Sequence, residues 1–215
     1  MPFMLITNRF YQYNTSMSSK LVGVVGFIGC GKGTVGDYLV SRHGYRAASF
    51  AHSLKDAVSC IFGWPRDLLE GNTPESRAWR ERPDPYWSSK MERDITPRWV
   101  LQYMGTEVMR NHFIDDIWIW SLEKKLVDLD QPTVITDVRF PNEIKLINDL
   151  GGKLLWIRRN PEPTWAEMAI NEPGSMRLCA DVHPSEYAWI GAADYRIIWN
   201  DSSLDDLYRQ VDVTI

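Results

Sequence analysis

The chain has 215 residues, 44% of them hydrophobic and 24% charged, a balance typical of globular proteins that excludes collagen, coiled coil and wholesale disorder. This length suits one α/β domain with insertions and leaves little room for two full domains. The chain has a formal net charge of −4, whereas proteins that bind a nucleic-acid backbone usually have an excess of basic residues. We therefore expect no nucleic-acid partner.

The beginning of the chain is polar. Residues 1–18 have neither the basic start nor the sustained apolar core of a secretory signal, so we expect a disordered extension before a single domain over residues 19–215. The longest apolar stretch, residues 21–30, is about half of the ~20 residues that a membrane span needs, so no membrane partner is expected. The three cysteines cannot all pair with one another, which favours reduced thiols and a cytoplasmic location.

Short apolar runs alternate with helical patterns along the chain. The expected strands have the composition of parallel strands buried on both faces, and they cover residues 21–26, 45–49, 133–136, 153–157 and 195–199. The expected helices follow them and cover residues 34–43, 54–62, 141–150 and 204–211. This alternation predicts an α/β fold with a parallel sheet flanked by helices.

Two proline-rich segments interrupt the alternation. The first begins at residue 64 and combines prolines with dense charge and aromatic side chains, so we expect a helical insertion on the substrate side over residues 64–118. The second covers residues 158–186 and is interpreted as a lid. The alternative for both segments is loop decoration of the surface.

A glycine-rich segment at residues 26–34, GFIGCGKGT, joins the first expected strand to the first expected helix. It satisfies G-x-x-x-x-G-K, in which glycines let backbone N–H groups surround an anion and the following helix adds its positive end. Lys32 would reach the β- and γ-phosphates of a nucleotide, and the Thr34 hydroxyl would help to place Mg²⁺. The alternative is a tight turn with an unrelated lysine. The G-K-G-T ending resembles nucleoside monophosphate kinases of the adenylate kinase type.

A phosphorylated acceptor must be neutralised before it can approach ATP, so its site should be rich in Arg and Lys. Leu54 and Lys55 begin an expected helix, where Lys55 is placed to grip a phosphate. Arg77 and Arg80 are three residues apart and share one face of a helix. The alternative for each of these cations is a solvated surface side chain.

A further cluster follows in the insertion. Arg98 comes after a helix-starting proline, and Gly105 and Thr106 would bend that helix and expose backbone groups. Trp118 offers a flat surface to a base, although most of the ten tryptophans are expected to serve packing.

Asp137 ends an expected buried strand, at the edge where open α/β sheets bind their ligands. It would hold Mg²⁺ through water or accept from a sugar hydroxyl or base edge, with Arg139 and Glu143 lining the same crevice. The alternative is a simple helix cap. Farther on, Arg158 follows another strand and suits a lid that closes over phosphates.

In this order, the motifs resemble those of the deoxynucleoside monophosphate kinases of tailed bacteriophages. The resemblance runs from about residue 21 to the end and is carried by residues 26–34, 48–58, 69–81, 98–107, 112–119, 136–143, 157–161, 183–186 and 200–207. Some phage relatives carry basic residues in the phosphate loop where this chain has Ile28 and Gly29, so the acceptor phosphate must depend more on Lys55 and the insertion arginines.

The resemblance implies transfer of the ATP γ-phosphate to deoxynucleoside monophosphates for phage DNA synthesis, in a homodimer that accepts several bases in the host cytoplasm. The expected ATP contacts are Ile28, Gly29, Gly31, Lys32, Gly33, Thr34 and Arg158. The expected deoxynucleotide contacts are Leu54, Lys55, Arg77, Arg98, Gly105, Thr106, Trp118, Asp137, Arg139 and Glu143. The expected catalytic residues are Lys32, Arg98, Asp137 and Arg139, and the expected Mg²⁺ ligands are Thr34 and Asp137.

Two other functions stay open on the sequence alone. Another small-molecule kinase with the same phosphate loop, such as a dephospho-coenzyme A kinase, would share the donor site. An ATP-gated interaction module would bind ATP without an acceptor. ADP production that depends on an acceptor separates the kinases from the module.

Overall fold

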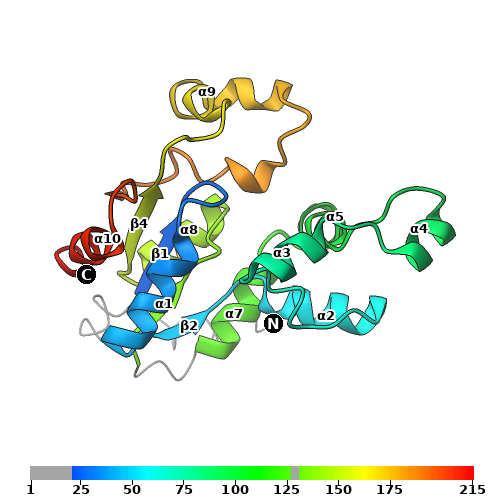
Figure 1. The fold of residues 1–215 in the computed structure, drawn as a ribbon, viewed down its shortest axis with the longest axis horizontal. Coiled ribbons are helices and arrows are strands. Elements are labelled where there is room, and N and C mark those ends of the chain that lie inside the picture. Colours follow the sequence, from blue (N-terminus) through cyan, green and yellow to red (C-terminus); the bar gives the residue numbers. More distant parts are fainter. Residues whose placement is uncertain (1–20, 127–130) are drawn as a thin grey trace, which may run out of the picture.

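The computed structural model describes residues 21–126 and 131–215 (Figure 1). The expected N-terminal extension, residues 1–18, lies outside the described residues. The five expected strands are all present and lie within one residue of their expected bounds; they are β1 (Leu21–Val25), β2 (Arg46–Ala48), β3 (Thr133–Ile135), β4 (Lys153–Arg158) and β5 (Arg196–Trp199). They form one parallel sheet in the order β2-β3-β1-β4-β5, which confirms the predicted fold class.

The central strand β1 explains why its sequence is apolar throughout. All five of its residues are buried, and its side chains alternate between two hydrophobic clusters. Val22 and Val24 lie in the cluster that includes residues of α1 (Lys32–His43) and α10 (Leu204–Asp212). Leu21 and Val25 lie in the other cluster, with residues of α8 (Pro141–Asp149). Helices on both faces therefore fix the sheet and its carboxyl edge.

The insertion forms a series of short helices that project away from the sheet (Figure 1). They are α3 (Pro74–Arg80), α4 (Pro85–Met91), α5 (Pro97–Gln102), a π-helical turn (Tyr103–Val108) and α6 (Met109–His112). Helix α2 (His52–Phe62) precedes the insertion, and α7 (Ile117–Leu126) begins at its end. Prolines begin three of these helices, each after a capping Thr or Asp that accepts from a backbone N–H. The prolines therefore start helices here and break none.

The segment after β4 lies beyond the glycine-rich loop (Figure 1). It contains α9 (Ala166–Asn171) and two 3₁₀ turns, Pro173–Leu178 and Pro184–Glu186. Phe27 of the loop packs edge-on against Trp165 at a ring separation of 5.1 Å and lies 5.5 Å from Trp189. These contacts hold the segment close to the loop. Within the described ranges, no helix has the length and apolar character to cross a membrane.

Candidate active site

The loop between β1 and α1 depends on its glycines. Gly26 and Gly31 adopt φ values of 144° and 109°, which side chains rarely tolerate. A Cβ atom would lie 2.4 Å from the Ile157 carbonyl oxygen at Gly26 and 2.4 Å from Asn200 Nδ2 at Gly31. Asn200 Nδ2 also donates to the Cys30 carbonyl at 2.9 Å, so the last loop after β5 braces the glycine loop.

The expected ATP contacts of the loop differ in exposure. Ile28, Gly29 and Gly33 are exposed, and Gly31, Lys32 and Thr34 are partly buried. Helix α1 begins at Lys32, two residues earlier than expected, so Thr34 lies in its first turn.

Lys32 is held inside the glycine loop. Its Nζ donates to the carbonyl oxygens of Gly26 at 2.7 Å and Phe27 at 2.8 Å. Burial lowers the pKa of Lys32, and the nearby Arg139 lowers it further. An ammonium group that is desolvated and near another cation gains strongly from an incoming anion.

Three arginines lie in one region of the molecule, and we call Arg80, Arg98 and Arg139 the arginine cluster. Of these, Arg139 acts on the ionisation of Lys32. Arg98 comes from α5, Arg80 from the end of α3, and Arg139 from the residues after β3. Burial is the largest cause of the lowered pKa of Arg80, and the charges of Arg98 and Arg139 lower this pKa further. Both guanidinium groups therefore lie close enough to Arg80 to influence its ionisation. The insertion and the sheet therefore bring like charges together.

One carboxylate stands between these cations. Glu186 Oε1 lies 2.8 Å from Arg139 Nη1 and 3.8 Å from Arg98 Nη2. Arg139 Nη1 also donates to the Ser185 carbonyl at 3.2 Å. Burial alone would raise the pKa of Glu186, but Arg139 and Arg98 hold it below its usual value. The 3₁₀ turn Pro184–Glu186 is thus tied to both the sheet edge and the insertion.

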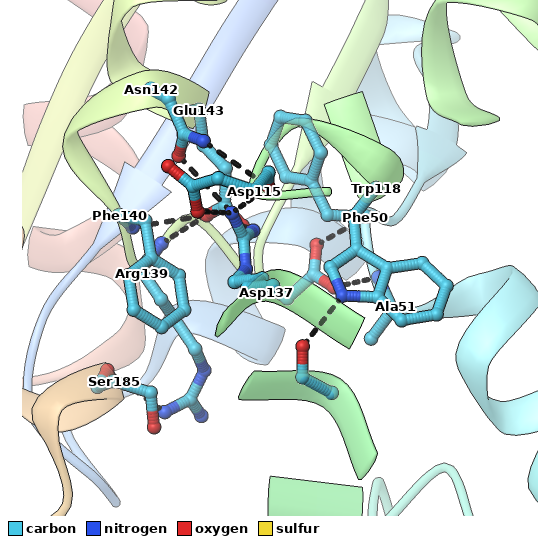
Figure 2. Close-up of polar contacts among 12 residues, drawn as sticks. Phe50, Ala51, Asp115, Trp118, Asp137, Arg139, Phe140, Asn142, Glu143 and Ser185 are labelled. Atoms are coloured by element: carbon cyan, nitrogen blue, oxygen red, sulfur yellow. Dashed lines mark hydrogen bonds and ion pairs between the residues drawn. The ribbon is translucent and has the colours of Figure 1, made fainter. Parts of the chain in front are cut away.

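Asp137 connects the end of β3 to the start of α2 (Figure 2). It accepts from Ser49 Oγ at 2.7 Å, Ala51 N at 2.9 Å and Phe50 N at 3.2 Å. This arrangement corresponds to the capping alternative, since the carboxylate satisfies backbone N–H groups before a helix. Oδ1 accepts only one of these bonds and keeps a lone pair for another donor or an ion.

Glu143, an expected nucleotide contact, lies in a buried ion pair. It is 3% exposed, and its Oε1 pairs with Arg110 Nη2 at 2.5 Å. Its Oε2 accepts from the backbone N–H groups of Arg139 at 2.6 Å and Phe140 at 3.1 Å (Figure 2). Burial raises the pKa of Glu143 to about 7, and the facing Arg110 opposes the rise. Glu143 therefore shapes the backbone that presents Arg139.

Trp118 also has a structural position where a base contact was expected. It is 7% exposed, and its Nε1 donates to the Gly105 carbonyl at 2.9 Å. Leu54 is 7% exposed and packs so closely that a Cβ on Gly105 would lie 2.8 Å from its Cδ2. Together these residues pack against the π-helical turn, a rare feature often found at functional sites, in which Thr106 is partly exposed.

Of the remaining expected contacts, two are held in ion pairs and one is exposed. Lys55 pairs with Glu70 at 2.5 Å, and its side chain is only 12% exposed. Arg158 pairs with Glu162 at 2.6 Å. Arg77 is exposed on α3, and its side chain forms no hydrogen bond or ion pair with any residue in the described ranges.

Three residues of this region were not predicted as site residues. Glu186 belongs to the HPSE motif at residues 183–186, which was noted without a role for the carboxylate. Arg80 was noted only for sharing a helix face with Arg77. Arg110 lies in none of the motifs, and nothing in the sequence distinguishes its buried ion pair from a surface charge.

Comparison with known proteins adds independent information. The sequence model of the family described as "Deoxynucleotide monophosphate kinase" matches residues 86–211. The chain is 30% identical over 205 residues to a protein of Acanthamoeba polyphaga mimivirus that is provisionally described as a deoxynucleotide monophosphate kinase; the match covers 89% of this chain and 93% of that protein. It is 45% identical over 56 residues to the deoxynucleoside-5′-monophosphate kinase of Escherichia phage T5, covering 26% of this chain and 22% of that one.

Similarity to solved structures is weaker. The dephospho-CoA kinase of Campylobacter jejuni aligns over 91% of this chain and 95% of its own, with 16% identity and a TM-score of 0.38. At this TM-score the match carries no argument about function. The alternative of a dephospho-coenzyme A kinase therefore gains no support from it.

Proposed function

Because the chain belongs to the deoxynucleotide monophosphate kinase family, we propose that the carboxyl edge of its sheet binds the two nucleotides of that reaction. A kinase of this family uses ATP to phosphorylate a deoxynucleoside monophosphate. The observation that carries the proposed site is the meeting of Lys32, Arg98 and Arg139 from three separate parts of the chain.

The donor site in this proposal is the glycine loop. Its inward-turned backbone N–H groups and the start of α1 receive the phosphates of ATP. Lys32 exchanges its two carbonyl partners for phosphate oxygens, which restores the full solvation of its charge. Arg158 and the exposed Ile28 remain proposed ATP contacts. To contact ATP, Arg158 would have to break its ion pair with Glu162 or bind the phosphate and Glu162 at the same time.

The acceptor site in this proposal lies between the glycine loop and the insertion. Arg98 and Arg139 bind the acceptor phosphate where the Glu186 carboxylate now stands. Bidentate guanidinium contacts suit a phosphate in both charge and shape. Thr106 and Lys55 remain proposed contacts of the sugar or phosphate.

The chemistry follows from this arrangement. An acceptor phosphate oxygen is already anionic, so no general base is needed for its attack on the γ-phosphorus. Lys32 and the arginines neutralise the charge shared by the donor and acceptor phosphates and hold them in line. We propose that residues 158–186 act as a lid that excludes water from this step, and that residues 64–118 form the acceptor side.

Mg²⁺ also belongs to the proposal. In the described part of the chain, no group of three or more His, Cys, Asp or Glu side chains is placed to hold a metal. A Mg²⁺ ion held mainly by nucleotide phosphates and water fits this, since it needs only one or two protein oxygens. Thr34 in the first turn of α1 and Asp137 through water would supply them. The ion would neutralise phosphate charge.

A coupled ADP-release assay tests the proposed function. The purified protein is incubated with ATP and each deoxynucleoside monophosphate, each ribonucleoside monophosphate, dephospho-coenzyme A, or no acceptor. We expect ADP release that depends on a deoxynucleoside monophosphate, with the diphosphate as the second product. Equal ADP release without any acceptor would contradict the proposal. The expected homodimer is a separate prediction, which light scattering of the eluted protein checks.

A further inference from the structure

Arg80 is positioned by a glycine turn rather than by an ion pair. Its guanidinium lies against the backbone of Gly71, where an added Cβ would be 2.1 Å from Arg80 Cζ. Gly71 also has a φ of 68°, which favours glycine. Because Gly71 has no Cβ, the turn before α3 leaves room for the Arg80 guanidinium.

Arg80 has no anionic partner of its own. Its Nε is buried and has no hydrogen-bond partner, and no residue within 21–126 and 131–215 accepts from its guanidinium. The nearest carboxylates already serve other cations, because Glu81 pairs with Arg98 at 2.9 Å and Glu70 pairs with Lys55 at 2.5 Å. Burial lowers the pKa of Arg80, and Arg98 and Arg139 add to this effect.

A structural arginine in this same chain looks different. Arg110 is 5% exposed and donates to the Asp115 carbonyl at 2.9 Å and to Glu143 at 2.5 Å. Buried polar groups are normally satisfied in this way, and an unsatisfied one calls for an explanation such as a bound ion or a catalytic role. Arg80 is therefore arranged to receive an anion from outside the chain.

The surroundings of Arg80 identify the anion. Arg98 and Arg139, which lie near enough to act on the ionisation of Arg80, are the proposed contacts of the acceptor phosphate. The anion expected at Arg80 is therefore that phosphate.

We propose that Arg80 is a further binding residue for the acceptor phosphate and that the Gly71 turn holds its guanidinium in place. This inference rests on the proposed function of the arginine cluster. It assigns the acceptor role on α3 to Arg80 rather than to the exposed Arg77. The guanidinium reaches the phosphate from the insertion, on the side away from the glycine loop.

The test compares Arg80→Gln and Arg80→Lys with Arg82→Gln, a matched loss of charge at an exposed residue two positions along. Titration calorimetry measures the dissociation constants of a deoxynucleoside monophosphate and of ATP, and thermal denaturation measures Tm. For Arg80→Gln we expect acceptor binding to weaken about 10- to 150-fold, because charged hydrogen bonds to the phosphate are lost. ATP binding should change less than about twofold, and Tm should not fall, because an unpaired buried charge is removed. Arg80→Lys should restore part of the acceptor affinity.

A positioning variant sharpens the test. Gly71→Ala displaces the Arg80 guanidinium, so it should weaken acceptor binding in the wild type and add little in Arg80→Gln. Wild-type acceptor affinity in Arg80→Gln, with a lowered Tm, would overturn the proposal and assign Arg80 a structural role. If the wild type itself releases no acceptor-dependent ADP, the proposed function fails instead. The two failures are therefore distinguishable.

Discussion

The pair Arg110–Glu143 and the arginine cluster differ in how completely their polar atoms have hydrogen-bond or ion-pair partners. In the pair Arg110–Glu143, each carboxylate oxygen and both terminal nitrogens of the guanidinium have a partner, and both side chains are buried. In the arginine cluster, Arg98 and Arg139 pair with two carboxylates, and the Nε of Arg80 has no partner. The first group maintains the fold, and the second has an excess of charge that a ligand must neutralise.

This difference separates residues that share one sequence motif. The segment TDVRFPNE at residues 136–143 contains Asp137, Arg139 and Glu143, all predicted as nucleotide contacts. Glu143 has both oxygens occupied, and Asp137 anchors the start of α2. Only Arg139 extends into the region of excess positive charge. A motif can therefore combine one residue that faces the ligand with others that hold it in place.

The largest effect on stability is expected for Arg110→Met. This change leaves Glu143 buried without its cation, which costs roughly 3–5 kcal/mol of the free energy of unfolding. Urea denaturation measures the loss. The double variant Arg110→Met, Glu143→Leu is the control and should regain part of the stability. If Arg110→Met instead raised KM for the acceptor at unchanged stability, the pair would belong to the binding site.

Lys32→Ala should reduce kcat at least ~100-fold, because it removes a positive charge that stabilises the transferred phosphoryl group. The fold should persist, since the partners of Lys32 Nζ are two carbonyl groups and the Cys30 thiol, all within the glycine loop. Initial-rate kinetics at saturating ATP measure the effect, and Lys124→Ala on the exposed surface of α7 is the matched control. Near-normal turnover of Lys32→Ala would contradict the donor site.

Arg139→Gln should lower kcat/KM for the acceptor about 10- to 150-fold, through loss of a charged hydrogen bond to phosphate. The matched control is Arg196→Gln, which removes an exposed charge from β5. Steady-state kinetics with varied acceptor and saturating ATP make the comparison. Equal values for the two variants would remove Arg139 from the acceptor site.

The smallest effect is expected for Arg77→Gln. The resemblance to phage kinases predicted an acceptor contact here, whereas the structure leaves the side chain exposed and without an ion pair in the described ranges. Loss of such a charge is worth about 0–1 kcal/mol, so KM for the acceptor should change by less than about fivefold. A loss as large as that of Arg139→Gln would indicate that α3 moves on binding and brings Arg77 to the phosphate.

The sequence was sufficient to predict the central strands of the sheet because β1, β3 and β4 are apolar runs whose residues are mostly buried. The edge strands β2 and β5 were also predicted, although most of their residues are exposed. The glycine loop was equally clear, since few other structures need this spacing of glycines before a lysine. The insertion helices were harder to foresee, because their prolines are helix starts after capping residues such as Thr73 and Asp84. The roles of Glu143 and Trp118 depend on burial and on partners far along the chain, Arg110 and Gly105, which no local pattern encodes.

The central claim is that the arginine cluster binds the phosphate of the acceptor. The most direct measurement compares the dissociation constants of one deoxynucleoside monophosphate and its deoxynucleoside, in the wild type and in Arg98→Gln. We predict that Arg98→Gln weakens binding of the monophosphate about 10- to 150-fold and leaves binding of the deoxynucleoside unchanged, because only the phosphate meets the guanidinium. Equal weakening of both ligands, or of neither, would contradict the claim.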